Sequence, residues 1–263
     1  MSRRVQSFER RLGIVLFERT RTGSQLTLVG EHFLRDAEFG ADHLRRVVEG
    51  ISLVRRGLAG SLRIGVIGSL AQGPLADLLA TYDERFPDVD VRIEKGSSQS
   101  QAVAVLNGKL DAAFLAGEPR LPGCESRHFY DDVLLAAIPA NHSLSSRSRL
   151  TWDDLREETL LVTADGSGPE VEGILLRRLS GLGFRPEIAV QHVGRDNLLN
   201  MVGKGFGLTL VVSAACGVPY PGVQFVPIEP ADIVSWSVVW PKNNANPALK
   251  RLLELSVASA RIA

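Results

Sequence analysis

SRRVQSFERRLG (residues 2–13) has the spacing of an amphipathic helix. Val5, Phe8 and Leu12 recur at i, i+3 and i+7, which places them on one helical face. Gly13 follows them, and glycine is typical just after the end of a helix. The opposite face is polar and basic, with Arg3, Gln6 and Arg10. We therefore predict a basic helix that contacts a negatively charged partner.

The next stretch, IVLFERTRTGSQLTLVG (residues 14–30), predicts a small β-ribbon. Two short apolar runs, 14–17 and 25–29, flank a turn rich in Arg, Thr, Gly and Ser, and the tip carries Arg19 and Arg21. A helix followed by a basic ribbon is the order of a winged helix. There the helix enters the DNA major groove and the ribbon reaches the backbone or the minor groove.

The charge of the chain is distributed unevenly. Residues 1–30 hold six arginines against Glu9 and Glu18, a local +4, while the whole chain has a formal net charge of zero. Overall neutrality therefore does not exclude a nucleic-acid partner.

The sequence offers no long uncharged apolar window for a membrane span and no apolar segment of a secretory signal. Cys124 and Cys216 are distant in sequence and predict small buried side chains in a reducing cytoplasm.

A long helix is predicted from Thr27, a typical N-cap residue, to about Leu58. Its apolar residues recur at alternating spacings of three and four, the a/d pattern of a coiled-coil seam. These residues are Leu34, Ala37, Ala41, Leu44, Val48 and Ile51. We predict that the helix pairs with a second helix. The alternative is that it packs against its own domain.

The remaining 200 or so residues predict an α/β architecture in two parts. In the first part, buried-strand runs alternate with helices in β-α-β-α-β order, and Ser98 and Gln101 form a predicted capping box. The second part repeats this kind of pattern, with Ser167 and Glu170 as another predicted capping box. The predicted strands are 62–67, 89–94, 110–116, 128–139, 159–163, 188–193 and 208–213, and the helices include 74–86 and 196–204. Two more strands and a last helix from Asn246 complete the chain.

The N-terminal stretch closely resembles the second half of the winged helix-turn-helix of LysR-type transcriptional regulators. The resemblance is carried by Ser2-Arg3-Arg4-Val5-Gln6-Ser7-Phe8-Glu9, Leu12-Gly13, Leu16-Phe17-Glu18-Arg19 and Leu26-Thr27-Leu28-Val29-Gly30. Further along, LRIGVIGS, LNGKLDAAFL and VGKGFGLTLV are similar to strand and loop signatures of the effector domain of that family. The resemblance covers essentially the whole chain.

This resemblance implies an α/β protein with a partial winged helix-turn-helix, a long linker helix and a two-lobed, periplasmic-binding-protein-like (type 2) effector domain. The expected boundaries are 1–29 for the partial DNA-binding domain and 30–60 for the dimerisation helix. Lobe I is expected at 61–133 and 237–263, and lobe II at 134–236.

Regulators of this type begin earlier, with a first helix and the helix and turn before the recognition helix. Either the coding start lies further upstream, which we favour, or the chain is a truncated product with weakened DNA binding.

By position, the resemblance implies that Ser2 bonds a phosphate, that Arg3 reads base edges and that Gln6 is a second reader or phosphate contact. Arg4 belongs to the same basic surface, and Arg21 on the wing adds a sequence-independent contact. An arginine can bond guanine with two donors in the major groove, where sequence is read. The alternative is a solvated basic helix surface.

The predicted effector site lies at the carboxyl ends of the strands, where ligands bind in parallel sheets. Free N–H groups at helix N-termini and nearby hydroxyls suit a carboxylate. The resemblance implies that Ser69 and Ser97 hold the acid group of the effector. The predicted residues are Ser69, Ser97, Ser98, Thr163, Asp165, Ser167 and Arg195. The alternatives are that Ser98 and Ser167 only cap helices and that Arg195 pairs with an acidic side chain.

Other motifs favour no enzyme, cofactor or metal. GKGFG (203–207) joins a helix to a strand, the reverse of a dinucleotide-binding turn, and is predicted to be a simple turn. The five histidines lack ligand spacing, so we predict no metal site. No nucleophile motif is present.

The sequence thus predicts a cytoplasmic, DNA-binding transcription regulator controlled by a small molecule, with a carboxylate favoured. The predicted partners are double-stranded promoter or operator DNA, the effector, and further copies of the chain in homodimers and homotetramers; RNA polymerase is a further candidate. The alternatives are an effector-binding or oligomerisation module without independent DNA binding, and a solute-binding protein.

Overall fold

The computed structural model describes residues 3–20, 23–56, 60–229 and 232–259. The chain forms two compact units, Met1–Leu58 and Ala59–Ala263, here called unit 1 and unit 2. Each unit is described by itself. None of the described helices is long and apolar enough to cross a membrane.

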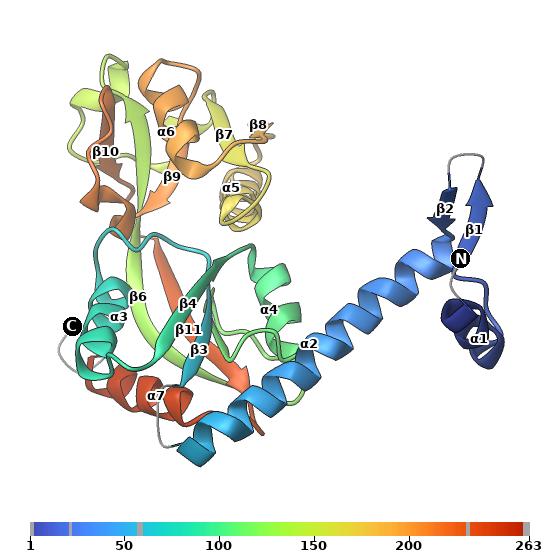
Figure 1. The fold of residues 1–263 in the computed structure, drawn as a ribbon. Coiled ribbons are helices and arrows are strands. Elements are labelled where there is room, and N and C mark those ends of the chain that lie inside the picture. Colours follow the sequence, from blue (N-terminus) through green and yellow to red (C-terminus); the bar gives the residue numbers. More distant parts are fainter. Residues whose placement is uncertain (1–2, 21–22, 57–59, 230–231, 260–263) are drawn as a thin grey trace. The chain divides into compact units, whose positions relative to one another are not determined.

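Unit 1 has the predicted order of helix, ribbon and long helix (Figure 1). Its elements are α1 (Arg3–Leu12), β1 (Phe17–Thr20), β2 (Gly23–Leu26) and α2 (Leu28–Arg56). β1 and β2 pair in antiparallel register from Phe17 opposite Leu26 to Thr20 opposite Gly23. Gly13 ends α1 with a φ of 69°, a left-handed conformation that favours glycine.

Three residues of the N-terminal motif hold unit 1 together. The carboxylate of Glu9 accepts hydrogen bonds from the backbone N–H groups of Leu16 (2.8 Å) and Phe17 (3.0 Å) and so fixes the connection between α1 and β1. Thr27 Oγ1 accepts from the N–H of Gly30 at 2.9 Å, which confirms Thr27 as the cap of α2. A Cβ on Gly30 would lie 2.1 Å from the carbonyl oxygen of Leu16, so this position requires glycine.

The apolar face predicted for α1 is only partly covered within unit 1. Val5 is half-buried, while Phe8 and Leu12 are 43% and 42% exposed. Phe8 contacts Phe33 of α2 edge to face, with ring centroids 5.6 Å apart. The short ribbon and α2 thus cover only part of this helical face and leave Phe8 and Leu12 exposed.

In unit 2, the first sheet begins as three parallel strands in the order β4-β3-β5. The strands are β3 (Ser61–Val66), β4 (Asp90–Lys95) and β5 (Ala112–Ala116), and the helices of this part are α3 (Pro74–Arg85), α4 (Ser98–Leu106) and α7 (Pro247–Ser259). Their buried core includes Leu62, Tyr82 and Phe114. We call this part lobe I.

Lobe II holds a mixed arrangement rather than the parallel one expected. β7 and β8 pair in parallel, whereas β9 and β10 pair antiparallel with β6. The elements are β7 (Thr159–Thr163), α5 (Gly168–Gly181), β8 (Glu187–Gln191), α6 (Arg195–Gly203), β9 (Thr209–Val212) and β10 (Val223–Pro227), with short 3₁₀ helices at Ser143–Ser146, Trp152–Leu155 and Ser213–Gly217. The GKGFG stretch is the turn between α6 and β9, as predicted.

Two long strands, β6 (Cys124–Pro139) and β11 (Ile233–Pro241), connect the lobes (Figure 1). They pair antiparallel with each other; β11 also pairs with β5 in lobe I, and β6 with β9 and β10 in lobe II. Near the crossing, the buried carboxylate of Asp132 accepts from the N–H groups of Val133, Ser213 and Ala214. A buried charge needs such donors. The lobes therefore share one antiparallel pair of strands.

The two cysteines, Cys124 and Cys216, are free thiols. They are half-buried rather than fully buried as expected, because both lie near the ends of their elements. Burial raises the pKa of both thiols.

Candidate functional site

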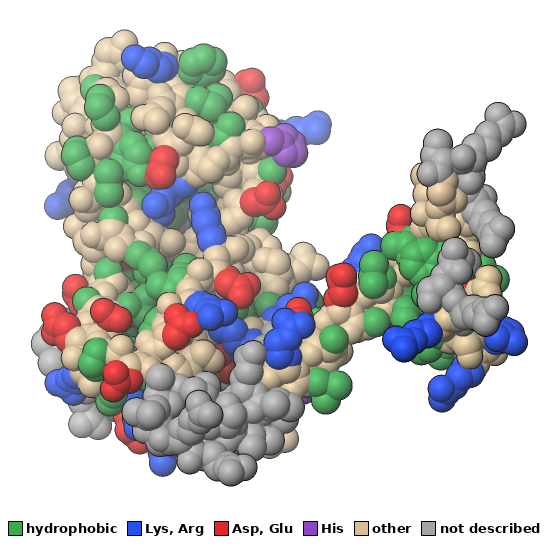
Figure 2. Space-filling model, in the orientation of Figure 1, with side chains coloured by type: hydrophobic (Ala, Val, Ile, Leu, Met, Phe, Trp, Pro, Cys, Tyr) green, Lys and Arg blue, Asp and Glu red, His purple; other side chains and the backbone are tan. Residues whose placement is uncertain are grey.

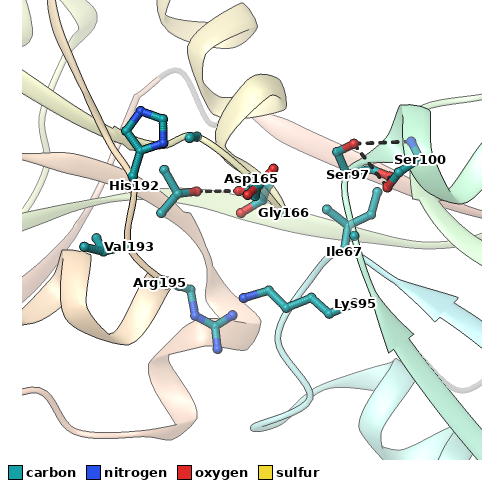
Figure 3. Close-up of a pocket in the computed structure, with 14 residues that line it drawn as sticks. Ile67, Lys95, Ser97, Ser100, Asp165, Gly166, His192, Val193 and Arg195 are labelled. Atoms are coloured by element: carbon teal, nitrogen blue, oxygen red, sulfur yellow. Dashed lines mark hydrogen bonds between the residues drawn. The ribbon is translucent and has the colours of Figure 1, made fainter. Parts of the chain in front are cut away.

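A cavity of about 580 Å³ lies between the lobes, at the carboxyl ends of parallel strands (Figure 3). Lobe I contributes Ile67 just after β3, and Lys95, Gly96, Ser97 and Ser100 from the end of β4 and the start of α4. Lobe II contributes residues 163–167 after β7 and residues 192–195 after β8. We call this space the outer cavity. It is where a ligand would contact both lobes at once.

Two cations approach each other across the outer cavity. In Figure 3 the ammonium end of Lys95, at the end of β4, points toward the guanidinium of Arg195, at the start of α6. Lys95 reaches lobe II: its Cε lies 3.3 Å from where a Cβ on Gly166 would be. Like charges that converge in this way repel each other, so an anion bound between them would be stabilised by both.

Arg195 is only loosely held by its neighbour Asp196. The two charges are 3.9 Å apart, and Arg195 Nε is buried without a hydrogen-bond partner among the described residues. Asp196 instead accepts from Tyr220 Oη at 2.7 Å. Burial, with Asp196 as the second cause, raises the pKa of Tyr220. Arg195 also interacts with Tyr220, which opposes the rise of that pKa. Its Nε still has no partner within the described residues, and this N–H can donate to a ligand.

The polar residues of the outer cavity are partly satisfied by local turns. Ser97 caps α4, and its Oγ accepts from the N–H of Ser100 (3.3 Å; Figure 3). Thr163 Oγ1 donates to the carbonyl oxygen of Asp165 at 2.6 Å. The Asp165 residue itself is exposed at the cavity wall.

A second, smaller cavity of about 60 Å³ lies deeper between the lobes and shares Thr163, Ser167 and Arg195 with the outer one. We call it the inner cavity. Most of its lining is apolar, from the core faces of β7, β9, α5 and α6. Its polar lining includes Ser69, whose Oγ accepts from the N–H of Ala71, and the side chains of Glu170 and Trp236.

Glu170 crosses from lobe II to the N-terminus of α4 in lobe I. Its Oε1 accepts from the backbone N–H of Ser98 at 3.0 Å. Its other oxygen, Oε2, is buried and has no hydrogen-bond partner within the described residues, and neither has Ser98 Oγ. A carboxylate at a helix N-terminus is favoured by the free N–H groups and the helix dipole.

These contacts correct both predicted capping boxes. The cap of α4 is Ser97 rather than Ser98, because Ser98 is already the first helical residue. Ser167 lies at the start of α5, but its side chain makes no capping hydrogen bond. Glu170 does not reach back to Ser167 because its carboxylate bonds Ser98 in the other lobe.

The structure brings most of the predicted effector residues to the two cavities. Ser97 and Asp165 line the outer cavity, Ser69 the inner one, and Thr163, Ser167 and Arg195 line both. Ser98 contributes its N–H to Glu170. Whether these residues bind an effector stays a prediction.

Sequence reasoning missed Lys95, Ser100, His192, Glu170 and Trp236. A signal existed for Lys95, because it is the last residue of a strand whose carboxyl end was expected to carry the site. Glu170 was assigned to a local cap, and no sequence signal links it to Ser98. Among the described residues, no group of three or more His, Cys, Asp or Glu could hold a metal ion.

The predicted DNA-binding surface lies on α1. Arg4 and Gln6 are exposed there, and Arg10 and Arg11 extend the basic surface toward the helix end. Figure 2 shows Lys and Arg side chains around this helix. Ser2 and Arg21 lie outside the described residues, as does the side chain of Arg3.

The predicted pairing residues on α2 are exposed within unit 1 where they are described. Leu34 is 42% exposed and Leu44 67%, with Ala37 and Ala41 exposed between them. The side chains of Val48 and Ile51 lie outside the described part. Figure 2 shows hydrophobic side chains along the surface of this helix.

The sequence matches the family model of the LysR substrate binding domain over residues 55–261. The chain belongs to this family. Among curated relatives, it is 25% identical over 257 residues to the HTH-type transcriptional regulator AlsR of Bacillus subtilis (strain 168), covering 97% of this chain and 85% of that protein. It is 28% identical over 258 residues to the HTH-type transcriptional regulator XapR of Escherichia coli (strain K12), covering 96% and 86%.

Solved structures agree with the fold. The chain superposes on the crystal structure of CbnR, a LysR family transcriptional regulator, with a TM-score of 0.80, 24% identity, and coverage of 98% of this chain and 88% of that one. Full-length CbnR complexed with its target DNA gives a TM-score of 0.81 at the same identity. Full-length BenM gives 0.66 at 22% identity, with 99% and 86% covered. The expected combination of a basic helix, a long helix and a two-lobed α/β domain is thus confirmed at the level of fold.

Proposed function

We propose that this LysR family chain is a transcriptional regulator that binds promoter DNA through α1 and the β1–β2 ribbon and responds to a small organic anion held between the lobes. The observation that carries the proposal is the convergence of Lys95 and Arg195 across the outer cavity. An anion there is contacted by one cation from each lobe, so it favours the arrangement in which the lobes approach. Such differential binding is what couples a ligand to a conformational equilibrium.

The DNA-binding part rests on the surface of α1. Arg4 and Gln6 are exposed on this helix, and the positional resemblance extends the contact surface to Ser2, Arg3 and Arg21. Arginine and amide side chains can both read base edges and contact phosphates. CbnR has been crystallised in complex with its target DNA, and the similarity of fold supports the same use of this fold here.

The oligomeric part rests on α2. Leu34, Ala37, Ala41 and Leu44 form an exposed apolar line at spacings of three, four and three. A second copy of α2 would cover this line. A homodimer would also present two copies of α1 to DNA, and pairs of dimers would form the tetramer expected from the sequence.

The experiment is a promoter-binding titration. Fluorescence anisotropy with a labelled fragment from upstream of the gene is measured at several salt concentrations, with and without members of a panel of small organic acids. We expect the logarithm of affinity to fall linearly with the logarithm of salt concentration, because phosphate contacts release counterions. At least one acid should change the affinity at fixed salt.

Lys95→Gln should abolish the response to the acid while leaving the salt slope of the ligand-free protein unchanged. The matched control is Arg92→Gln, on the same strand but paired with Asp90 outside the cavity. An equal response in Lys95→Gln and Arg92→Gln would refute the proposed ligand site. A protein that binds the acid but no promoter fragment would instead be an effector-binding and oligomerisation module.

A further inference from the structure

We infer that the ligand of this site carries, besides its acid group, a hydrogen-bond donor such as an ammonium or hydroxyl group, and that Glu170 is the residue that selects it. This inference rests on the proposed function, because it assigns the second end of a ligand whose acid end lies between Lys95 and Arg195. It concerns the inner cavity, which shares lining residues with the outer cavity.

Unsatisfied polar atoms gather around the inner cavity. Among the described residues, the buried side-chain atoms without a hydrogen-bond partner include Glu170 Oε2, Arg195 Nε and Trp236 Nε1, and all three residues line this cavity. Buried polar atoms are usually paired, and each unpaired one costs free energy. A ligand end group that donates within the cavity would give Glu170 Oε2 its missing partner, and a hydroxyl could in addition accept from Trp236 Nε1.

These atoms need different partners on the ligand: the two donors need an acceptor, and the one acceptor needs a donor. Arg195 Nε and Trp236 Nε1 can only donate, whereas a carboxylate oxygen of Glu170 accepts. Arg195 also lines the outer cavity and therefore lies where the acid end would be. The group nearest Glu170 must then offer an N–H or O–H.

The position of Glu170 also disfavours an acid group at the Ser98 N–H, on the inner side of the α4 N-terminus. The Ser98 N–H that a ligand carboxylate would bond already donates to Glu170 Oε1 at 3.0 Å. A second carboxylate placed there would meet the charge of Glu170 in a largely apolar surrounding, and like charges at short range repel strongly. The volume of about 60 Å³ admits a small end group rather than a whole ligand.

The test compares straight-chain acids of matched and graded length that differ only at the far end. The four series end in a methyl group, a hydroxyl, an ammonium or a second carboxylate. Binding to the 263-residue chain is measured by calorimetry and by the shift in Tm. We expect the ammonium series to bind about tenfold or more tightly than the methyl series, with the hydroxyl series between them and the dicarboxylates weakest.

Glu170→Gln keeps the shape of the side chain and an oxygen for the Ser98 N–H but removes the charge. We expect it to lose most of the ammonium preference and to bind the dicarboxylates more tightly than the wild-type chain does. Glu172→Gln, on the same helix but outside the lining of either cavity, is the matched control and should behave as the wild type. Asp165→Asn tests the other carboxylate, on the outer wall.

The outcomes separate this inference from the proposed function. Acids that bind through Lys95 without a preference for a donor end, or with a preference that survives Glu170→Gln or is erased by Asp165→Asn instead, would overturn the inference and leave the anion site intact. If no series binds, or if binding is unchanged in Lys95→Gln, the anion site itself is refuted and the inference fails with it.

Discussion

Units 1 and 2 bury their apolar side chains very differently. In the described part of unit 1, Leu16 is the apolar side chain that is fully buried, at 4% exposure, while Phe8, Leu12, Leu34 and Leu44 are open to solvent. Unit 2 contains three buried apolar clusters, one in lobe I and two in lobe II. Burial of apolar area is the main source of folding free energy. Unit 2 therefore has its own source of stability, whereas unit 1 leaves much of its apolar surface for other molecules.

The difference matches what each unit would have to do. A receptor domain must keep the walls of its cavity in place without contacts from another chain. The buried core around β3, β5 and β11 supports the cavity wall in this way. A surface that pairs with a second chain and contacts DNA must remain open until the partners meet. Exposed apolar patches of this kind mark interaction sites.

The largest expected effect comes from the core of lobe I. Phe114 is fully buried and its ring centroid lies 5.3 Å from that of Phe129. Phe114→Ala should lower the free energy of unfolding of unit 2 by about 3–5 kcal/mol, because it removes a large buried side chain and leaves a cavity. The measurement is urea denaturation followed by tryptophan fluorescence, since Trp152, Trp236 and Trp240 all lie in unit 2.

Leu44→Ala is the matching change in unit 1. Because Leu44 is 67% exposed, it should change the stability of the isolated monomer by less than about 0.5 kcal/mol. It should instead raise the dissociation constant of the dimer, measured by analytical ultracentrifugation. If Leu44→Ala left self-association unchanged, α2 would not be the pairing surface. The exposed apolar side chains of unit 1 would then not be explained by pairing with a second chain.

A smaller loss of stability than that of Phe114→Ala is expected at the junction of the ribbon and α2. Gly30→Ala would place a Cβ 2.1 Å from the carbonyl oxygen of Leu16, so the start of α2 must move. We expect a cost of about 1–3 kcal/mol, as for other overpacked sites. The loss should be confined to unit 1, with faster amide hydrogen exchange around residues 16–30 and weaker DNA binding, and with an unchanged fluorescence transition of unit 2.

Gly40→Ala is the control for this change, because a Cβ at Gly40 has no atom within 4 Å. Alanine should stabilise the helix here by about 0.5–1 kcal/mol. If Gly30→Ala and Gly40→Ala changed the stability of unit 1 equally, the contact between a Cβ at Gly30 and the Leu16 carbonyl oxygen would not be the cause.

The order of elements could be predicted from the sequence because it depends on local patterns. The strand at Thr159–Thr163 has the predicted bounds, and α2 ends within two residues of its prediction, since hydrophobic periodicity and caps are encoded nearby in the chain. The antiparallel pairing of β9 and β10 with β6 was not predicted, because pairing joins segments far apart in sequence.

The same limit applies to the candidate site. Ser97, Thr163 and Arg195 follow strands or begin helices, so their positions could be inferred from topology. The bond between Glu170 and Ser98 joins two lobes across 72 residues. Nothing in the spacing of these residues distinguishes this bond from a local cap, and only packing in three dimensions selects it.

A further prediction concerns a polar group in the core of lobe I. Tyr82 is fully buried and donates to the carbonyl oxygen of Ala248 at 2.9 Å, and burial, opposed by the nearby Arg251, raises the pKa of Tyr82 from 10.0 to about 12. Tyr82→Phe should cost about 1 kcal/mol at neutral pH, because it leaves this carbonyl without its donor. Urea denaturation followed by fluorescence again measures the loss in unit 2.

The pH dependence gives a sharper test of the same residue. Between pH 10 and about 12 the unfolded chain releases the Tyr82 proton while the folded chain retains it. The unfolded state then binds fewer protons, so stability falls as pH rises, by at most about 1.4 kcal/mol per pH unit. Tyr82→Phe should make this fall less steep in unit 2. The remaining part is due to other groups whose pKa burial raises, among them Tyr130, Tyr220 and the two cysteines. An unchanged slope would mean that the core does not keep Tyr82 protonated at high pH. The core of unit 2 would then shield this side chain from water less than its burial indicates, and the difference in burial between units 1 and 2 would be smaller at this residue.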